Sequence, residues 1–291
     1  MKKESRKGAI RESDLKKKSV LVFYYLMYLV MFIVCAIMLF PLLWVFLSSV
    51  KTYEEVIRIP PPIFPQTFDF QNIVDVWKRM KFYRYFLNSV VVTSGSVLSC
   101  LLFGGMLGYV LSKMKPKGSE VILKMLFFTM LIPGTTNLVP AYYTWVNFPI
   151  FGNLTNTYYP FWIGSAAGVY NIILFKNFFD TVPKSYIESA TLDGCSRFGV
   201  FARIVVPISA PIFLTIGIFT FGGSWNDYLM PMLILKKDSL KTIGVALSGA
   251  KNMAGNKGIL AVMYSIILPI IVFCVAQKYV LNNDAMTGIK E

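Results

Sequence analysis

Six long apolar stretches constrain this chain more than any other feature of its sequence. A helix needs about 20 apolar residues to cross the hydrocarbon core of a bilayer. Six segments of the chain meet this requirement. We therefore predict an all-α, polytopic membrane protein with six transmembrane helices. The predicted spans are Leu21–Leu47, Tyr85–Ser112, Val121–Trp145, Tyr158–Phe179, Ile212–Leu235 and Ile259–Leu281.

The composition agrees with a membrane protein and argues against an enzyme. Only 15% of the 291 residues are charged, whereas soluble domains carry roughly 25%. Histidine is absent, which removes the commonest general base and the commonest metal ligand. The four cysteines are scattered, so neither a disulfide framework nor a zinc site is indicated. We expect no catalytic residue, no metal and no cofactor.

The net charge of +14 is better explained by membrane topology than by nucleic-acid binding, because the basic residues cluster beside apolar spans. Residues 1–20 form a basic tail, which we place in the cytosol beside anionic lipid. An even number of spans then puts both termini in the cytosol, with the chain in the cytoplasmic membrane. Lysines 113, 115 and 117 fit this topology. The basic residues in the long loops 51–84 and 238–258 fit it less well, although long loops weigh less.

A polar stretch between the fourth and fifth spans predicts a short, rigid helix. Ser185 and Glu188 have the spacing of a capping box, which predicts that the helix begins at Ser185. Gly194 favours the left-handed conformation that ends a helix. The helix would thus be about two turns long, and Pro207 and Pro211 follow it. A short capped helix between membrane spans is a projection suited to docking another protein.

The same stretch resembles the "EAA" loop of permease subunits of ABC importers. The matching residues are Glu188, Ala190, Asp193, Gly194, Phe201, Ile204, Pro207 and Pro211. The chain departs from the pattern at Ser189 and Cys195, and both residues are small. The resemblance implies a type I ABC importer permease fold with a cytosolic coupling loop over 180–211. It also implies that this loop contacts an ATPase through Ser185, Glu188, Ala190, Asp193, Gly194 and Pro207.

A second polar string, Trp225-Asn226-Asp227-Tyr228, lies inside the fifth apolar segment. A carboxylate at the centre of a membrane helix costs about 2.5–3.5 kcal/mol, so Asp227 should face a polar cavity or a partner. Nearby Pro231 and paired glycines favour irregular backbone, which is tolerated where it lines a cavity. Aromatic faces with amide and carboxylate groups suit a sugar. The alternative is that these aromatic residues pack helices near the outer membrane interface.

This string also resembles the W-N-[ED]-[FY]…P segment of the sugar-importer branch of ABC permeases. The C-terminal residues from Gln277 to Lys290 resemble the tail of that branch, which can contact the ATPase, although Asn283 and Ile289 depart from it. The implied arrangement has five parts. They are the tail 1–20, a first transmembrane helix 21–50, an extracytoplasmic loop 51–84 containing Pro60–Pro62, a permease core 85–282 and a cytosolic tail 283–291.

The resemblance implies the smaller permease subunit of a maltose-type importer for di- or oligosaccharides. Its partners would be a second permease, an ATPase dimer, an extracytoplasmic sugar-binding protein and membrane lipid. The chain has no Walker-type phosphate-binding motif, so ATP hydrolysis would belong to another chain. Gly104, Gly105 and Gly108 permit close helix packing, either within the chain or against the second permease. Two alternatives remain open, namely an ABC permease for a non-sugar solute and an ion-coupled transporter working alone.

Overall fold

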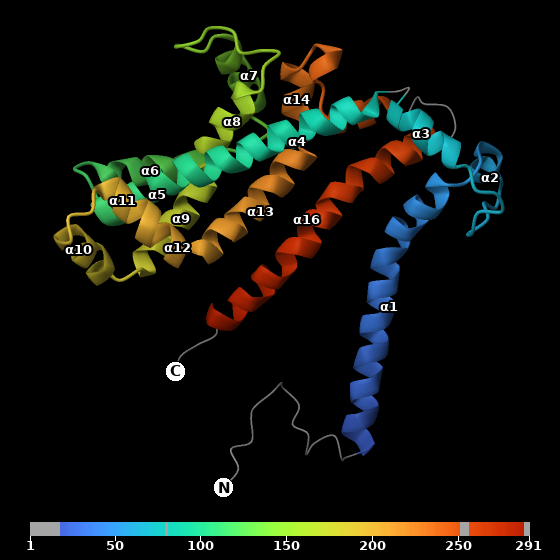
Figure 1. Ribbon diagram of the computed structural model, residues 1–291, viewed down its shortest axis with the longest axis horizontal. Coiled ribbons are helices and arrows are strands. Elements are labelled where there is room, and N and C mark those ends of the chain that lie inside the picture. The colour runs from blue at the N-terminus through green and yellow to red at the C-terminus, as the bar shows by residue number, and fades with distance from the viewer. Residues whose placement is uncertain (1–17, 79–80, 251–255, 288–291) are drawn as a thin grey trace. The chain divides into compact units, whose positions relative to one another are not determined.

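The computed structural model describes residues 18–78, 81–250 and 256–287, and the named secondary-structure elements in these ranges are all helices (Figure 1). Most of the predicted basic tail, residues 1–17, lies outside the described residues. The end of the C-terminal tail, 288–291, does too. The chain divides into two compact units, 1–73 and 74–291.

The first unit contains the first predicted span. Helix α1, Lys18–Ser49, is 32 residues long, and its buried residues are Ser48 and Ser49. Most of its apolar side chains are therefore exposed within this chain, as expected for a helix that contacts lipid or another subunit. Helix α2, Tyr53–Ile57, follows after a short turn.

Polar contacts fold the proline-rich connection after α1 back on itself. Buried Lys51 donates from Nζ to the carbonyl of Pro62 at 2.5 Å. Glu55 accepts hydrogen bonds at 2.9 Å from both the amide and the hydroxyl of Thr67. Burial alone would raise the pKa of Glu55, but the bonds from Thr67 hold it below its usual value. Residues 51–67, the first part of the predicted outer loop, thus form an internally bonded segment. Helix α3, Phe70–Lys78, lies in the second part of that loop.

The second unit is built around one long helix. It comprises α4 (Phe82–Ser99), a π-helical turn (Cys100–Gly104), α5 (Gly105–Tyr109) and a second π-helical turn (Val110–Met114). Together these 33 residues form a continuous apolar helix long enough to span a membrane. The last helix, α16, covers Lys257–Thr287 and passes the same test over Lys257–Gln277. The second and sixth predicted spans are therefore continuous helices.

The other three predicted spans are each interrupted, which was expected from Pro231 and the paired glycines only for the fifth span. Val121–Trp145 divides at Pro133 and Gly134, where the lost amide and the flexible glycine end the helix. Tyr158–Phe179 divides at Gly168, which has extended backbone, and Ile212–Leu235 divides at Asp227. The resulting pairs are α6 (Ser119–Met130) with α7 (Leu138–Val146), α8 (Tyr159–Ala166) with α9 (Val169–Thr181), and α13 (Ala210–Asn226) with α14 (Leu229–Ile234).

Within the described residues, three helices are long and apolar enough to cross a membrane. A fourth is counted if residues 197–208 and 210–226, which meet at 83°, act as one broken span. The chain is thus a helical, multi-pass membrane protein, and six crossings stay a prediction.

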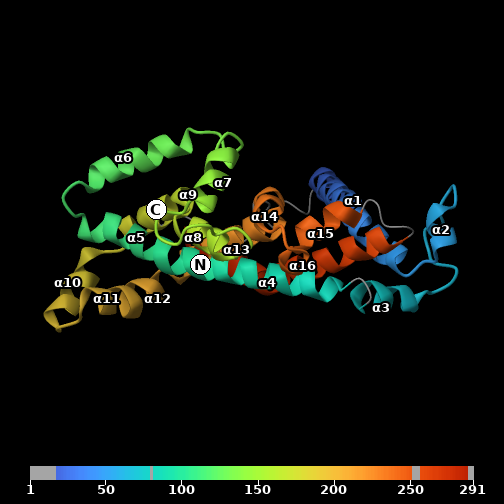
Figure 2. The same cartoon turned by 90° about the horizontal axis from the view of Figure 1, so that it is seen from above.

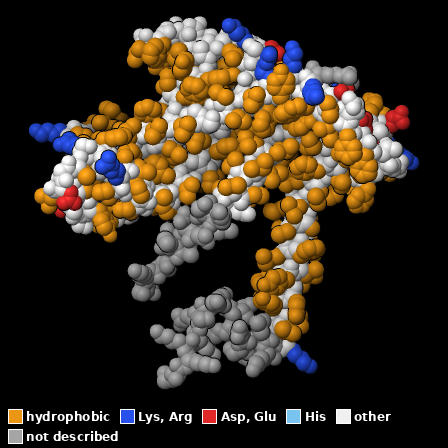
Figure 3. All heavy atoms as spheres, in the orientation of Figure 1, with side chains coloured by type: hydrophobic (Ala, Val, Ile, Leu, Met, Phe, Trp, Pro, Cys, Tyr) orange, Lys and Arg blue, Asp and Glu red, His pale blue; other side chains and the backbone are white. Residues whose placement is uncertain are grey.

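The core of the second unit is made by close packing of α4 and α5 against their neighbours (Figures 1 and 2). Helix α4 packs against α8 and α13, α5 against α9, and α13 against α16. A Cβ added at Gly108 would lie 2.6 Å from the Cβ of Phe175 and 3.1 Å from the amide nitrogen of Lys176. Gly108 therefore serves packing within the chain. Figure 3 shows apolar side chains spread over the visible surface, with Lys and Arg in a few small groups.

Candidate functional site

The predicted short helix is present as α10, Lys184–Leu192. Its C-terminal end is a Schellman motif, because the Cys195 amide donates to the Ala190 carbonyl at 3.0 Å and the Gly194 amide donates to the Thr191 carbonyl at 3.1 Å. Gly194 has φ +80°. The predictions of a helix of about two turns and of a left-handed glycine that ends it are both confirmed.

The predicted start of this helix is wrong. Pro183 occupies the N-cap position with extended backbone, and no side chain caps the helix. Ser185 lies inside the first turn, so it does not form the predicted capping box with Glu188. The local reason is that Pro183 favours the extended backbone of an N-cap residue. Proline also has no backbone N–H group, so no amide hydrogen is left without an acceptor at this position. The helix can therefore begin directly at Lys184.

The segment after α10 turns back into the core in short helical pieces. Ser196 caps α11 (Arg197–Val200) by accepting a hydrogen bond from the amide of Gly199 at 3.1 Å. A π-helical turn (Phe201–Val205) and α12 (Val206–Ile208) follow, and Pro207 lies in the first turn of α12. Pro211 lies in the first turn of α13. The two prolines thus bracket the bend at Ser209, where a straight helix cannot continue.

The predicted coupling residues divide into a buried anchor and an exposed face. Ala190 is buried and belongs to a core cluster with Phe175, Phe179, Phe201 and Val205. Ser185, Glu188, Asp193 and Gly194 are exposed, and Glu188 makes no ion pair within the part of the chain that the structure describes. Large apolar side chains are exposed on the same segment, namely Tyr186, Leu192 and Phe198. Such a surface, apolar with a free carboxylate, is suited to a protein partner.

A polar clasp, which sequence patterns do not reveal, holds the entry to α10 on the long helix. Lys113 donates from Nζ to the Val182 carbonyl at 2.6 Å. Ser112 donates to Asp180 at 2.6 Å, and Asp180 also pairs with Lys176 at 2.7 Å. The Lys176–Asp180 pair has the i,i+4 spacing that brings two side chains together on one face of a helix. The contacts of Ser112 and Lys113 join residues almost 70 positions apart, so local spacing carries no signal of them.

We expect Lys113→Met to weaken the link between α10 and the core while it keeps the apolar stem of the side chain. The lost hydrogen bonds at the Val182 and Asp180 carbonyls should reduce solute uptake by a few-fold, with the amount of protein in the membrane unchanged. Uptake into vesicles, normalised to membrane-inserted protein, measures the effect. Lys117→Met, at an exposed position near the same turn, is the matched control and should behave as wild type. Equal uptake by both variants would contradict the role of the clasp.

The structure places the second predicted string at the break between α13 and α14. Trp225 is buried, and its indole nitrogen donates to the Ser265 carbonyl at 3.1 Å. Its ring lies 5.8 Å from the rings of both Phe86 and Phe221. Trp225 therefore packs α13 against α4 and α16, which is the alternative interpretation of this residue.

The three residues after Trp225 are more accessible. Asn226 is exposed, and its side chain donates to the Gly222 carbonyl at 2.9 Å. Asp227 has extended backbone and is half-buried, and one of its carboxylate oxygens accepts from the Met230 amide at 3.4 Å. The irregular backbone predicted here occurs at Asp227 and Tyr228, whereas the glycine pair 222–223 lies within α13. Tyr228 is half-buried. Their role in a substrate pathway stays a prediction.

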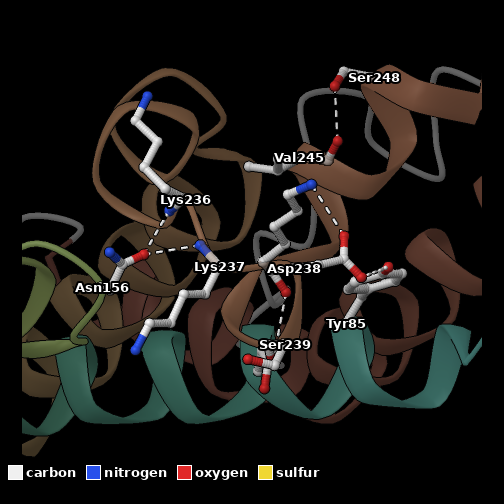
Figure 4. Close-up of polar contacts among 10 residues, drawn as sticks. Tyr85, Asn156, Lys236, Lys237, Asp238, Ser239, Val245 and Ser248 are labelled. Atoms are coloured by element: carbon white, nitrogen blue, oxygen red, sulfur yellow. Dashed lines mark hydrogen bonds and ion pairs between the residues drawn. The ribbon is translucent and has the colours of Figure 1, made fainter.

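A second polar cluster, also missed from the sequence, fixes the loop after α14 (Figure 4). Asn156 accepts hydrogen bonds at 2.8 Å from the amides of both Lys236 and Lys237. Asp238 accepts from Tyr85 of α4 and pairs with Lys241, each at 3.0 Å. The bonds from Lys241 and Tyr85 hold the pKa of Asp238 below its usual value, so this carboxylate stays ionised at neutral pH.

The clasp and this loop lie at opposite ends of one membrane-length helix. Asn88 of α4 donates to the carbonyls of Ser239 and Lys241, each at 2.9 Å, whereas Ser112 and Lys113 hold the entry to α10. A rise of 1.5 Å per residue puts Asn88 and Ser112 about 36 Å apart. This exceeds the hydrocarbon thickness of a bilayer, about 30 Å. The two ends of this helix are therefore separated by more than the thickness of the hydrocarbon core.

A comparison with known protein families identifies the family of this chain. Residues 13–282 match the family described as "Binding-protein-dependent transport system inner membrane component". The chain belongs to this family. It is therefore an ABC transporter permease, a transport subunit whose ATPase is a separate subunit.

Curated relatives include permeases named for sugar import. The chain is 30% identical over 234 residues to "Melibiose/raffinose/stachyose import permease protein MelC" of Bacillus subtilis, covering 78% of this chain and 83% of the relative. It is 28% identical over 258 residues to "Arabinooligosaccharides transport system permease protein AraQ" of the same organism, covering 87% and 90%. It is also 32% identical to "Protein LplC" of Bacillus subtilis, over 71% of this chain and 68% of the relative.

The fold of this permease is also that of a solved importer. It matches a chain of a bacterial ABC transporter involved in the import of the acidic polysaccharide alginate with a TM-score of 0.80. The match covers 90% of this chain and 98% of that chain, at 23% sequence identity. A likeness at this identity establishes the fold, which is that of an ABC importer permease.

Proposed function

We propose that this chain is one of two permease subunits of an ATP-driven importer for di- or oligosaccharides, in which α10 is the contact with the ATPase. The observation that carries the proposal is the structure of the α10 segment. It is a short helix with an exposed apolar and acidic face, bonded through Lys113 to one end of a membrane-length helix. Motion of a bound ATPase would be passed to the spans through this rigid attachment, as alternating access requires.

The proposed topology has six crossings, with both termini and α10 in the cytosol. Each interrupted pair of helices then counts as one crossing. The cytosolic tail 1–20 is strongly basic, in agreement with the positive-inside rule. Lys113, Lys115 and Lys117 lie at the same end of the long helix as α10. The loop 235–241 at the other end would face the outside, where an extracytoplasmic sugar-binding protein delivers substrate.

The proposed substrate class comes from the relatives, which are named for arabinooligosaccharides and for melibiose, raffinose and stachyose. Asn226, Asp227 and Tyr228 at the break after α13 offer amide, carboxylate and phenol groups that can bond sugar hydroxyls. The break lies within a helical bundle, where irregular backbone is expected next to a solute pathway.

Uptake by the purified complex in proteoliposomes tests the proposal. The complex should take up at least one di- or oligosaccharide only when its binding protein, its ATPase and ATP are all present. Uptake of a polyamine or an ion with the same requirements would replace the sugar by another solute. Uptake that persists without the ATPase would contradict the proposal and indicate an ion-coupled transporter.

A pair of substitutions separates packing from substrate contact in the second string. Trp225→Phe removes the hydrogen bond to Ser265 but keeps an aromatic ring, so it should lower stability by about 1 kcal/mol and leave the half-saturating sugar concentration unchanged. Asn226→Ala removes only an exposed hydrogen bond to the Gly222 carbonyl, so it should lower the melting temperature less than Trp225→Phe does and raise the half-saturating sugar concentration by several-fold. Thermal melts of the detergent-solubilised complex and uptake kinetics measure the two effects. Unchanged uptake by Asn226→Ala would remove this residue from the pathway.

A further inference from the structure

Hydrogen bonds to a distant part of the chain hold the backbone of the loop Leu235–Lys241 in place. The side-chain oxygen of Asn156 accepts hydrogen bonds from the backbone amides of both Lys236 and Lys237. The backbone amide of Asn156 donates to the Ile234 carbonyl at 3.0 Å. Asn156 itself has φ +56°, a conformation that asparagine tolerates better than most residues. Loops held rigidly by a scaffold commonly carry binding residues.

This loop carries more lysines than carboxylates. The Asp238 carboxylate is engaged by Lys241 and Tyr85. Lys236 and Lys237 are exposed, and neither forms an ion pair within the residues that the structure describes. Lys236 donates from Nζ to the Met232 carbonyl at 3.3 Å, a neutral partner that leaves its charge uncompensated. Figure 4 shows both ammonium groups lying away from Asn156. The loop thus presents two positive charges from a fixed backbone.

We propose that Lys236 and Lys237 form a docking point for carboxylates on the surface of the extracytoplasmic binding protein. This inference rests on the proposed function and its topology, and it adds a recognition chemistry to that partner. A fixed backbone lowers the ordering entropy of docking. Paired opposite charges mainly speed encounter and set orientation, and their effect falls with salt. We favour a protein partner over lipid headgroups because family members depend on a binding protein.

The test measures ATP hydrolysis by the full complex in nanodiscs as its oligosaccharide-loaded binding protein is titrated in. Lys236→Glu with Lys237→Glu should raise the half-saturating concentration of binding protein about ten-fold and leave the maximal rate unchanged. The corresponding double glutamine variant should give a smaller rise, and raising salt to 0.5 M should reduce the difference from wild type. Lys117→Glu, at the other end of the long helix, is the control and should match wild type.

Other outcomes are equally decisive. An unchanged half-saturating concentration for the double glutamate variant, in a wild-type complex that does respond to binding protein, would overturn this inference alone. An effect that occurs in nanodiscs containing phosphatidylglycerol and is absent in pure phosphatidylcholine would overturn it in favour of lipid headgroups. A wild-type complex that its binding protein does not stimulate would overturn the proposed function, and this inference with it. Equal melting temperatures establish that the variants are folded.

Discussion

Replacing Gly194 with valine is expected to reduce solute uptake by about ten-fold or more without reducing membrane insertion. Gly194 has φ +80° and closes the C-terminal end of α10. A β-branched residue in this conformation is strained by about 1–3 kcal/mol, and 1.4 kcal/mol corresponds to a factor of ten. The strain should unravel the end of α10 and displace the exposed face that we assign to the ATPase contact. Uptake and ATP hydrolysis, measured together in proteoliposomes, give the coupling ratio.

Gly194→Asn is the matched control for this prediction. No atom lies within 4 Å of a Cβ built at Gly194, so the expected defect comes from backbone strain and not from a steric clash. Asparagine adopts the left-handed conformation more readily than valine, and this variant should keep most of the uptake. Equal uptake by the valine and asparagine variants would show that the conformation of this glycine is unimportant for coupling.

The second large effect is expected from Gly108→Ala, which should lower the yield of folded protein and its melting temperature. Even one methyl group at this position would lie 2.6 Å from the Cβ of Phe175, with the Lys176 amide nitrogen 3.1 Å away and the Ile172 carbonyl oxygen 3.2 Å away. Because two of these atoms are backbone, α5 and α9 must move apart. Overpacking of this kind costs about 1–3 kcal/mol, equivalent to a fall of roughly 2–12 °C in melting temperature.

Gly222→Ala tests whether that loss is specific to the packing contact. Gly222 also lies in an apolar helix, α13, but a Cβ there has no neighbour within 4 Å. This variant should match wild type in yield, measured by size-exclusion chromatography in detergent, and in its thermal melt. A Gly108→Ala protein as stable as Gly222→Ala would contradict the close packing of α5 on α9.

Local chain chemistry explains which parts of the coupling loop could be predicted from sequence. The end of α10 was predictable because a glycine at this position serves a purely local hydrogen-bonding pattern at a helix end. The start was mispredicted because two local signals compete. The Ser185 and Glu188 spacing favours a capping box, but Pro183, two residues earlier, already has the extended conformation of an N-cap residue.

Hydropathy predicted where the apolar segments lie but not whether each is one helix. An average over about 20 residues is hardly changed by a single break such as Pro133-Gly134 or Gly168, because the flanking residues stay apolar. A break nevertheless changes the hydrogen bonding of the backbone, and it divides two of the predicted spans between separate helices. The break at Asp227 is likewise invisible to hydropathy, and irregular backbone was predicted there only because Pro231 and a glycine pair lie nearby.

The polar contacts that position the two ends of the core could not be predicted, because they join residues distant in the chain. Lys113 and Val182 are 69 positions apart, and Asn156 and Lys236 are 80 apart. Neither pair has a spacing rule comparable to i,i+4 within a helix. Trp225 presents a related difficulty, since a large aromatic residue is equally common in a helix interface, a membrane interface and a binding site.

Site-specific photo-crosslinking tests most directly whether α10 is the ATPase contact. A benzophenone amino acid is placed at Leu192, which is 88% exposed on α10, and in a second protein at Lys237, at the other end of the long helix. In the intact complex, the Leu192 position is predicted to crosslink to the ATPase subunit, and the Lys237 position is not. Crosslinking of the ATPase to the Lys237 position, with none from Leu192, would contradict the account.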